Sequence, residues 1–323
     1  MLSGRRRGAS AAGLGRSGGS CPRPAAALAP PAGIACRARA SLPTDRWSWS
    51  SNAAAGYTPT ARVAPRPRRS SPPSLTWAYQ GPHAADEREA MSTSSRGSVL
   101  LIGASRGLGL AMAEEYLERG WQVTGTVRGP RTTGLHDLAE RSNGQLRIEA
   151  VDINVPDQVR ALRQRLQSRS FDLLFVNAGV ANGPDETIAD VSTEEFTRLM
   201  VTNALSPMRV LESLQDLVPA HGTLGVMSSG QGSVANNHRG GFEVYRASKA
   251  ALNTLMRSFA ARHADDPRAL VLIAPGWVRT DLGGPHARLS IEESIPNVVN
   301  TIEAQRGQAG LHYLDYLGQT VAW

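Results

Sequence analysis

The chain alternates short apolar runs with helix-like stretches, and this alternation restricts the folds that it can adopt. Residues 99–102, VLLI, begin the series, and strand-like runs follow at 123–127, 146–151, 171–176, 224–227, 270–273 and 312–314. A short, continuous apolar run is typical of a strand that is buried on both faces. Helices are predicted between these runs, at about 110–120, 156–166, 192–214, 245–259 and 290–307. Because strands separated by helices are typical of a parallel sheet, we predict an α/β fold with a doubly wound parallel sheet of about seven strands.

The first ninety residues differ in composition from the rest. Residues 1–90 contain thirteen arginines and four acidic residues, whereas residues 91–323 contain twenty-two basic and twenty-four acidic residues. A segment rich in Pro and Gly without hydrophobic periodicity is predicted to be disordered. We therefore predict a leader, 1–90, followed by one folded domain, 91–323. Three interpretations of the leader stay open: a secretory signal, although no uninterrupted apolar core follows; an organellar transit peptide; or an extension upstream of a true start at Met91.

The positive charge of the chain belongs to that leader. The whole chain carries a formal charge of +7, while the counts for 91–323 leave the domain mildly acidic. This removes the main argument for nucleic-acid binding. Both cysteines, Cys21 and Cys36, lie in the leader, and the histidines lack ligand spacing, so no metal site is assigned. Since no apolar run approaches the length that spans a bilayer, we predict a cytoplasmic protein, or an organellar one if the leader is a transit peptide.

A glycine-rich segment, 103–109, lies directly between the first strand and the first helix, with the spacing Gly-x-x-x-Gly-x-Gly. Glycines permit a tight turn and a close backbone approach, and a helix N-terminus offers free N–H groups to a pyrophosphate. This placement predicts a dinucleotide site. An acid about twenty residues beyond the loop selects a ribose 2′-hydroxyl, whereas an arginine accepts a 2′-phosphate. Because Arg128 holds this position and Arg106 lies in the loop, NADP(H) is predicted in preference to NAD(H), which remains the alternative.

Polar residues follow several predicted strands at their carboxyl ends. Asp152 ends the third strand, and Asn-Ala-Gly at 177–179 follows the fourth. Ligands of parallel sheets bind beyond these ends, although each of these residues could singly serve a turn. In the helix predicted over 192–214, Pro207 lacks the N–H that would bond to the carbonyl of Asn203. That carbonyl is left free for water or a ligand, or the helix simply kinks.

Lys249 is the only lysine in the chain, and Tyr245 precedes it by one helical turn. Residues four apart on a helix share a face. An ammonium beside a phenol favours the phenolate and lowers the tyrosine pKa, which equips the phenol to exchange a proton near neutral pH. The alternative is an ordinary surface pair. We predict an acid–base site at this helix.

Taken in order, these motifs resemble the classical short-chain dehydrogenase/reductase family over residues 98–323. The segments YRASKAALN at 245–253 and PGWVRTDLGG at 275–284 resemble its C-factor-like branch, which includes the sniffer-type carbonyl reductases. The resemblance implies a single Rossmann-type sheet and an NADP(H)-dependent oxidoreductase that interconverts a carbonyl and an alcohol. Because the branch has an association with intercellular signalling, the alternative is a cofactor-binding regulatory protein with little turnover.

The resemblance also implies catalytic roles. Tyr245 would be the general acid or base, and Lys249 would lower its pKa and hold the nicotinamide ribose. The sequence SGQG at 229–232 selects Ser229 over Ser228 as the serine that hydrogen-bonds the substrate oxygen. Asn203 would complete a water-linked proton path. The interval from Ser229 to Tyr245 is sixteen residues, longer than the family's common thirteen.

The cofactor contacts implied by the resemblance follow the same strand ends. Asp152 would meet the adenine, and Thr280 the carboxamide. Asn177 and Gly179 would meet the adenosine-side ribose, although Val176 stands where the family has a further asparagine. The full set implied to contact the cofactor is Gly103, Ser105, Arg106, Gly107, Leu108, Gly109, Arg128, Asp152, Asn177, Ala178, Gly179, Tyr245, Lys249, Pro275, Gly276, Val278 and Thr280.

The expected partners follow from this function. They are a small carbonyl or alcohol substrate and a second copy of the chain, with a monomer as the alternative; neither nucleic acid nor a membrane is expected. The short segment between Thr280 and Leu289 predicts a modest or open substrate pocket. Removing residues 1–90 is expected to leave cofactor affinity unchanged.

Overall fold

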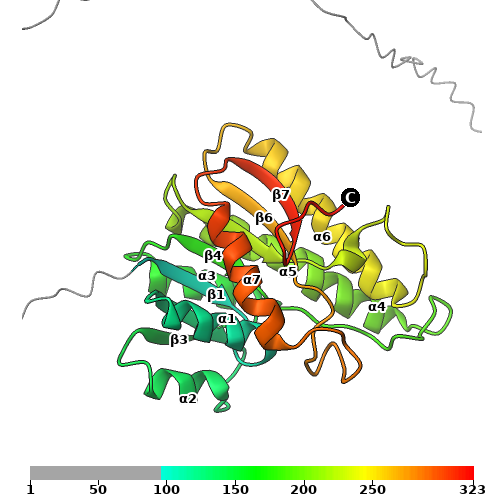
Figure 1. Cartoon of the computed structure of the whole chain (residues 1–323), viewed down its shortest axis with the longest axis horizontal. Coiled ribbons are helices and arrows are strands. Elements are labelled where there is room, and N and C mark those ends of the chain that lie inside the picture. The colour runs from blue at the N-terminus through cyan, green and yellow to red at the C-terminus, as the bar shows by residue number, and fades with distance from the viewer. Residues whose placement is uncertain (1–95) are drawn as a thin grey trace, which may run out of the picture. The chain divides into compact units, whose positions relative to one another are not determined.

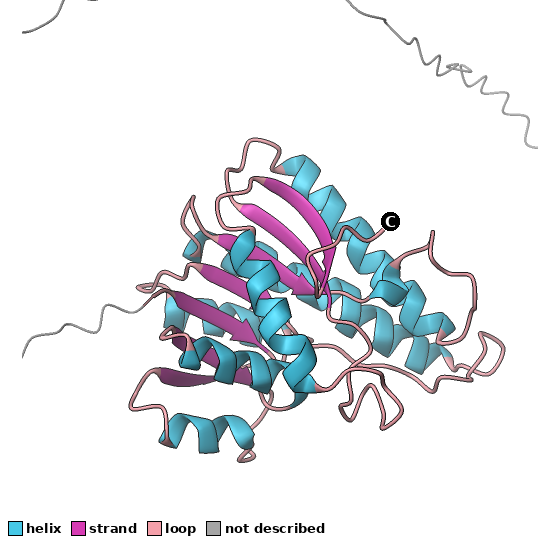
Figure 2. Ribbon diagram, in the orientation of Figure 1, coloured by secondary structure: helices cyan, strands magenta, loops and turns pink. Residues whose placement is uncertain are grey.

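Seven strands form one parallel sheet in the order β3-β2-β1-β4-β5-β6-β7 (Figures 1 and 2). The structure, a computed structural model, describes residues 96–323, so the predictions for the leader lie outside the described residues. The strands are β1 (Ser98–Ile102), β2 (Gln122–Val127), β3 (Leu146–Ala150), β4 (Leu173–Val176), β5 (Thr223–Met227), β6 (Ala269–Ala274) and β7 (Gly310–Asp315). The predicted seven-stranded, doubly wound sheet is confirmed.

The strand order reverses between β1 and β4. From β1 the chain moves outward through β2 and β3, then returns to the other side of β1 and continues outward to β7. A parallel sheet opens a crevice beyond the carboxyl ends of its strands where the order reverses in this way. The glycine-rich segment follows β1 and the Asn-Ala-Gly segment follows β4, so both lie at that crevice.

Helices cover both faces of the sheet. The α-helices are α1 (Gly107–Glu118), α2 (Gly134–Glu140), α3 (Pro156–Leu166), α4 (Thr193–Met200), α5 (Ser206–Leu214), α6 (Glu243–Arg262) and α7 (Ile291–Ala304). One core joins α3, α5 and α6 to a face of the sheet, and a second joins α1, α2 and α7 to the other. Within β1, Leu100 and Ile102 enter the first core while Val99 and Leu101 enter the second, as the period of two in a strand requires.

Local chemistry explains where two of these helices begin. Ser290 and Glu293 form a reciprocal capping box at α7. At α4, Ser192 accepts the hydrogen bond from the Glu195 backbone N–H, but the Glu195 carboxylate pairs with Arg198 instead of returning to the helix start. The start of α4 therefore has only one of the two hydrogen bonds of a capping box. The sequence analysis also missed α2.

The single helix predicted over 192–214 is divided by a π-helical turn, Val201–Leu205. The N–H of Ser206 bonds to the carbonyl of Val201, five residues back. A π turn inserts one extra residue into a helix and is frequent at functional sites. Asn203 lies in this turn and Pro207 follows it, so the helix widens where the sequence predicted a freed carbonyl or a kink.

Within residues 96–323, no helix combines the length and the apolar character needed to cross a membrane.

Candidate active site and cofactor crevice

The glycine-rich segment packs tightly against the end of β4. Gly103 has φ of 88°, and a Cβ added there would lie 2.9 Å from the backbone of Ala178. A Cβ on Gly109 would lie 2.1 Å from the carbonyl oxygen of Gly103. Neither position can accept a side chain without moving backbone. Both positions therefore require glycine for the loop to pack, whether or not a ligand is bound.

The N-terminus of α1 is open to a ligand. Arg106 is the N-cap residue, and no side chain caps the first turn of the helix. The free N–H groups and the partial positive charge of such a terminus suit a phosphate. Together with the absence of side chains at the loop glycines, this open terminus fits the pyrophosphate of a dinucleotide.

Asn177 supports the loop. Its Nδ2 donates to the carbonyl oxygen of Gly103 at 2.9 Å. The side chain that was expected to meet a ribose is therefore engaged in fixing the glycine turn, and its direct contribution is to position that turn. Asp152 is also partly engaged, since its Oδ1 accepts the backbone N–H of Asn154 at 2.9 Å in a local turn.

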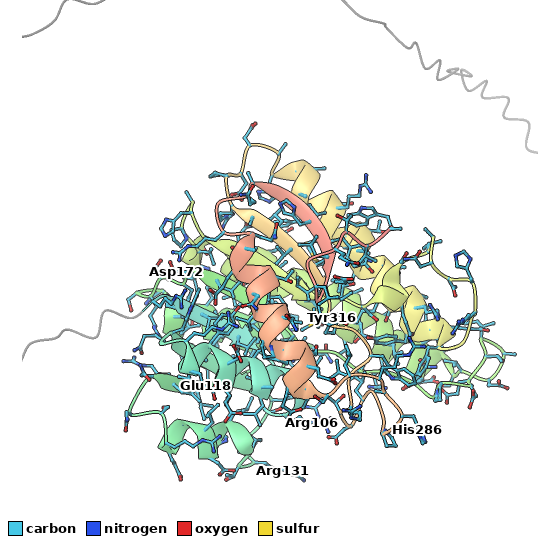
Figure 3. The ribbon with its side chains drawn as sticks, in the orientation of Figure 1. Arg106, Glu118, Arg131, Asp172, His286 and Tyr316 are labelled. Carbon is cyan, nitrogen blue, oxygen red and sulfur yellow. The ribbon has the colours of Figure 1, made fainter. Side chains whose placement is uncertain are left out.

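The two arginines predicted to select a 2′-phosphate differ in their surroundings. Arg106 pairs with Asp281 at 2.7 Å, and both side chains are more than three-quarters exposed. Figure 3 labels Arg106 beside the loop that carries His286. Arg128 is exposed, and no ion pair engages it within the described residues. The Arg106–Asp281 pair links the glycine loop to the segment that follows β6.

Residues 275–283 form the opposite wall of the crevice. A Cβ on Gly107 would lie 3.9 Å from Cγ2 of Thr280, so the two segments face one another. Thr280 Oγ1 accepts the N–H of Gly283 at 3.0 Å, and the carbonyl of Pro275 accepts from Ser294 Oγ at 2.7 Å. Val278, which was also predicted to contact the cofactor, is buried.

Ser229 and Tyr245 come together at the end of β5. The Ser229 hydroxyl interacts with the phenol and lowers its pKa, but burial has the larger effect and leaves the pKa of Tyr245 raised. The adjacent Ser228 has a different partner, because its Oγ donates to the buried Asn253 Oδ1 at 2.6 Å. The geometry therefore agrees with the choice of Ser229 over Ser228.

Lys249 contacts the backbone of β5 in this structure. Its Nζ donates to the carbonyl of Met227 at 2.8 Å and lies 5.9 Å from the centroid of the Tyr245 ring. Burial lowers the pKa of the ammonium to about 8. The expected lowering of the Tyr245 pKa by Lys249 is absent, since burial raises that pKa and the hydroxyl of Ser229 supplies the opposing effect. Without a charge partner, the ammonium turns to the nearest backbone carbonyl.

The side chains of Asn203 and Lys249 both approach Gly179. Asn203 holds the backbone of Val180 from both sides, accepting its N–H at 2.9 Å and donating to its carbonyl at 2.8 Å, and it also donates to Ser248 Oγ. A Cβ on Gly179 would lie 3.4 Å from Asn203 Oδ1 and 3.5 Å from Lys249 Nζ. The π-helical turn, the end of β4 and α6 thus bring these polar groups to one point.

Three residues of the site were missed from sequence. Tyr313 in β7 donates its hydroxyl to the carbonyl of Ser229 at 2.6 Å, and Ser248 holds Asn203. The buried Oε1 of Gln231 has no hydrogen-bond partner within the described residues. Ser248 adjoins Lys249 and could have been suspected, but Tyr313 is eighty-four residues from Ser229, and no local pattern connects them.

These groups can perform acid–base chemistry on a carbonyl or alcohol oxygen. A phenol with a serine hydroxyl beside it can transfer a proton at that oxygen. The glycine loop and the open helix terminus lie at the same edge of the sheet, where a dinucleotide would be bound.

Comparisons with known proteins agree with this site. The family model described as Enoyl-(Acyl carrier protein) reductase matches residues 103–305. A short-chain dehydrogenase/reductase from Burkholderia multivorans, solved with bound NADP, is 64% identical, with a TM-score of 0.69 over 70% of this chain and 99% of that chain.

Two further relatives belong to the branch predicted from sequence. The C-signal protein of Myxococcus xanthus is 34% identical over 167 residues, which are 51% of this chain and all of that protein. The carbonyl reductase Sniffer of D. melanogaster is 28% identical, with a TM-score of 0.63 over 70% of this chain and 99% of that chain. Since the family match spans more than half of the chain and full-length relatives align with its folded part, the protein belongs to the classical short-chain dehydrogenase/reductase family.

Proposed function

We propose that the protein is an NADP(H)-dependent oxidoreductase that interconverts a carbonyl and an alcohol, with Tyr245 as the general acid or base. The observation that carries this proposal is the convergence of Tyr245 and Ser229 at the end of β5, on the same sheet edge as the open glycine loop. Relatives named as reductases and dehydrogenases, one of them solved with NADP, support it.

The side chains of the site divide the proton chemistry between them. Because burial raises the pKa of Tyr245, its phenol is protonated at neutral pH and can donate to the substrate oxygen during reduction. Ser229 holds that oxygen where negative charge develops. When bound, the nicotinamide supplies or accepts the hydride. The ammonium of Lys249 would exchange a proton with the phenol through a water held near Asn203, since both residues approach Gly179.

The same structure supports a role for Lys249 on the ribose. Its ammonium is buried, with one carbonyl partner, that of Met227. An ammonium has three donors, so two N–H groups remain for the hydroxyls of a nicotinamide ribose. Such hydroxyls would keep the lysine oriented toward Tyr245.

Arg106 and Arg128 support NADP(H) over NAD(H). A 2′-phosphate would have to compete with Asp281 for Arg106, but an exposed ion pair of this kind contributes only about 0–1 kcal/mol and is easily replaced. The Burkholderia multivorans relative contains NADP. NAD(H) remains the weaker alternative, because a ribose without the 2′-phosphate would form no ion pair with Arg106 or Arg128.

The direct test is cofactor oxidation with a panel of aldehydes, ketones and quinones, using NADPH or NADH. We expect turnover with NADPH that is abolished in Tyr245→Phe, since phenylalanine keeps the ring and removes the proton. Tight binding of NADPH to the native protein without turnover of any compound would contradict the enzyme function. Binding of neither cofactor would contradict the proposal as a whole.

The similarity to C-signal favours one second candidate, a cofactor-binding regulatory protein with little turnover. A protein that only binds a cofactor has no need of Tyr245, Ser229 and Asn203 together. The Tyr245→Phe variant distinguishes the two functions. A regulatory protein would keep both its NADPH affinity and its biological effect after this substitution.

A second copy of the chain is the expected protein partner. Leu205 and Leu255 are each about 40% exposed on a shallow apolar hollow that Met200, Val201, Ala204, Leu205, Ala251, Thr254 and Leu255 line. Pairing through α4, the π-helical turn and α6 would cover this surface. A cytoplasmic location is expected, or an organellar one if residues 1–90 act as a transit peptide, and a fluorescent fusion of the full chain would distinguish these.

A further inference from the structure

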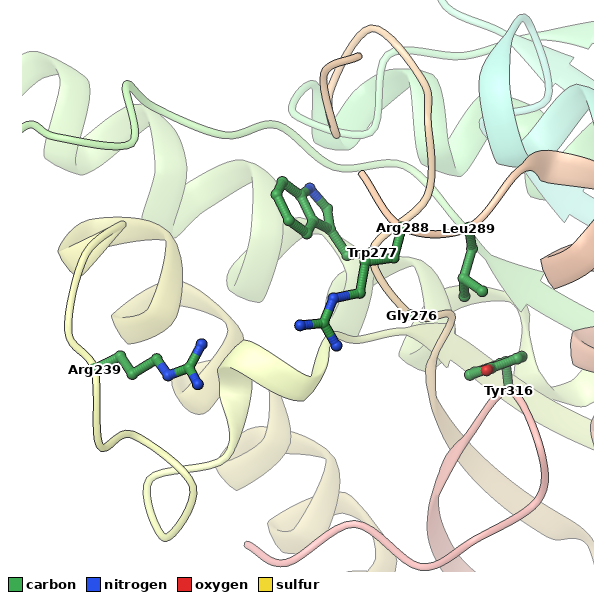
Figure 4. A pocket seen from close by; sticks show the side chains of 6 residues that line it. All are labelled: Arg239, Gly276, Trp277, Arg288, Leu289 and Tyr316. Atoms are coloured by element: carbon green, nitrogen blue, oxygen red, sulfur yellow. The ribbon is translucent and has the colours of Figure 1, made fainter. Parts of the chain in front are cut away.

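A cavity of about 430 Å³ lies at the carboxyl edge of the sheet (Figure 4). Its volume is in the range that holds a small organic molecule. Six residues line it: Arg239, Gly276, Trp277, Arg288, Leu289 and Tyr316. Two of the six are arginines and none is acidic, so the cavity is electropositive.

The two arginines come from different loops and face the same space. Arg239 belongs to the loop before α6, and Arg288 to the segment between β6 and α7. Figure 4 shows their guanidinium groups pointing toward one another from opposite sides. In the part of the chain that the structure describes, no hydrogen bond or ion pair engages either guanidinium, although arginines elsewhere are repeatedly paired with acids. Both side chains are exposed, and an anion bound between them would accept hydrogen bonds from both guanidinium groups.

The backbone beneath each arginine is fixed. Arg246 Nε donates to the carbonyls of Gly240 and Gly241 at 3.1 and 2.8 Å, which anchors the loop directly after Arg239. Arg279 Nη1 donates to the carbonyls of Ala287 and Arg288 at 3.1 and 3.2 Å. Each loop is therefore tied down before a ligand arrives, and an anion need not order the backbone to be bound.

Two segments that line the cavity adjoin segments that carry residues of the candidate active site. Arg239 precedes Tyr245 by six residues on the loop that leads into α6. Tyr316 follows β7, whose Tyr313 donates its hydroxyl to the carbonyl of Ser229. Trp277 is 51% exposed and provides an apolar wall for a carbon skeleton between the two ends of a substrate.

We propose that the substrate is an anionic carbonyl compound, whose carboxylate or phosphate is bound jointly by Arg239 and Arg288 while its carbonyl lies at Tyr245. This proposal rests on the oxidoreductase function. The anionic group is unchanged by the reaction: the carbonyl carbon gains a hydride from the reduced cofactor, and the oxygen gains the proton from Tyr245. Arginine suits this task because its planar guanidinium can donate two parallel hydrogen bonds to a carboxylate or phosphate.

The test compares charged and uncharged substrates of matched shape, using the full chain and NADPH. The three probes are 4-carboxybenzaldehyde, its methyl ester and 4-formylphenyl phosphate. We expect the native protein to prefer the acid or the phosphate over the ester in kcat/KM, and the larger of the two preferences identifies the anionic group. In R239Q/R288Q this preference should fall on the order of 100-fold, because both charge-assisted contacts to the anionic group are lost, while turnover of the ester stays within about threefold.

Arg147→Gln is the matched control. Arg147 is exposed on β3, at the opposite edge of the sheet from β7, and it pairs with no acid among the described residues. Its substitution should leave the preference unchanged. Equal kcat/KM for acid and ester in the native protein, or an equal loss on both in R239Q/R288Q, would overturn the proposal.

A binding experiment separates this proposal from the enzyme function. Calorimetry of the Tyr245→Phe protein with NADP and 4-carboxybenzaldehyde measures recognition without turnover. Arginine-dependent binding of the acid, together with no turnover by the native protein, would sustain the anion site and contradict the oxidoreductase. Turnover of acid and ester at equal rates would sustain the oxidoreductase and overturn the anion site.

Discussion

Two adjacent serines at the end of β5 have separate tasks, and substitution should separate them. In Ser229→Ala the phenol loses its hydroxyl neighbour and the substrate oxygen loses a donor, so kcat should fall about 10²- to 10³-fold with little change in stability. Steady-state kinetics at saturating NADPH and a urea unfolding curve measure the two effects.

Ser228→Ala should lower the stability of the protein and leave kcat nearly unchanged. It leaves the buried Asn253 Oδ1 without its 2.6 Å partner, which costs about 1–3 kcal/mol of unfolding free energy, while kcat stays close to the native value. Loss of kcat in Ser228→Ala with no loss in Ser229→Ala would mean that the catalytic serine has been misassigned.

Lys249 is expected to lower the stability of the cofactor-free protein. Because burial lowers the pKa of Lys249 from 10.5 to about 8, the unfolded chain binds more protons than the native protein between these values. Native stability therefore rises through this pH range. Lys249→Met should raise the unfolding free energy at pH 7 by about 1–3 kcal/mol.

Urea unfolding of both proteins from pH 7 to pH 10.5 tests this linkage. The advantage of Lys249→Met should be complete below pH 8 and shrink as the pH approaches 10.5. The same variant should lose turnover. A stability difference that is independent of pH would contradict the lowered pKa of Lys249, whereas a less stable variant at pH 7 would show that the lost hydrogen bond to Met227 outweighs the titration.

For individual residues, the sequence was sufficient to place Tyr245 and Lys249 on one helix face, because helical spacing alone determines this. It could not predict the direction of the ammonium. That direction depends on the carbonyl of Met227, which reaches the site from a strand eighteen residues before Tyr245. Tyr313 was missed for the same reason, since its contact with Ser229 exists only once β7 joins the sheet.

Among the elements, the glycines at the two ends of the β1–α1 unit allow a direct comparison, since Gly103 follows β1 and Gly120 follows α1. Gly103 and Gly120 both have positive φ, 88° and 78°, but an added Cβ would contact the Ala178 backbone at Gly103 and nothing within 4 Å at Gly120. Gly120→Ala should cost only the strain of the backbone, about 1 kcal/mol. Gly103→Ala should cost more stability and also weaken NADPH binding at least tenfold.

Thermal unfolding and fluorescence titration with NADPH measure these effects. Equal losses of stability in the two variants, with unchanged NADPH affinity in Gly103→Ala, would mean that the loop tolerates displacement from β4 and does not form the cofactor site.

The elements that sequence analysis missed are those set by few residues or by packing. The helix α2 is only seven residues long, too short for helical periodicity to emerge. The π-helical turn arises where Pro207 removes one N–H and Asn203 is held by Val180 and Ser248. The proline was visible in the sequence, but the partners of Asn203 come from the segment after β4 and from α6 and could not be predicted.

For the molecule as a whole, the apolar hollow between α4, the π-helical turn and α6 predicts association. Leu255→Glu places a charge on this hollow, and if two copies pair there, desolvating that charge should weaken the dimer by at least about tenfold. Light scattering across a dilution series of the full chain measures this. A native protein that is monomeric at all concentrations would contradict the pairing.

The sheet as a whole was predictable because its alternation of strands and helices permits few arrangements. The number of strands and their parallel direction followed from that pattern. The burial of the strands also followed from the pattern, since the apolar runs 99–102, 224–227 and 270–273 are buried in the structure. The electropositive cavity was not predictable, because Arg239 and Arg288 lie forty-nine residues apart in loops without a repeating pattern.

The strand order β3-β2-β1-β4-β5-β6-β7 also determines how the chain can be assembled during synthesis. Each strand, as it leaves the ribosome, joins an edge that already exists, and none has to insert between two neighbours. The sheet can therefore grow vectorially from β1 without dismantling earlier pairs. Because β7 is the last strand of this sheet and carries Tyr313, which donates to the Ser229 carbonyl, we expect this contact beside the candidate active site to form only after the preceding strands have paired.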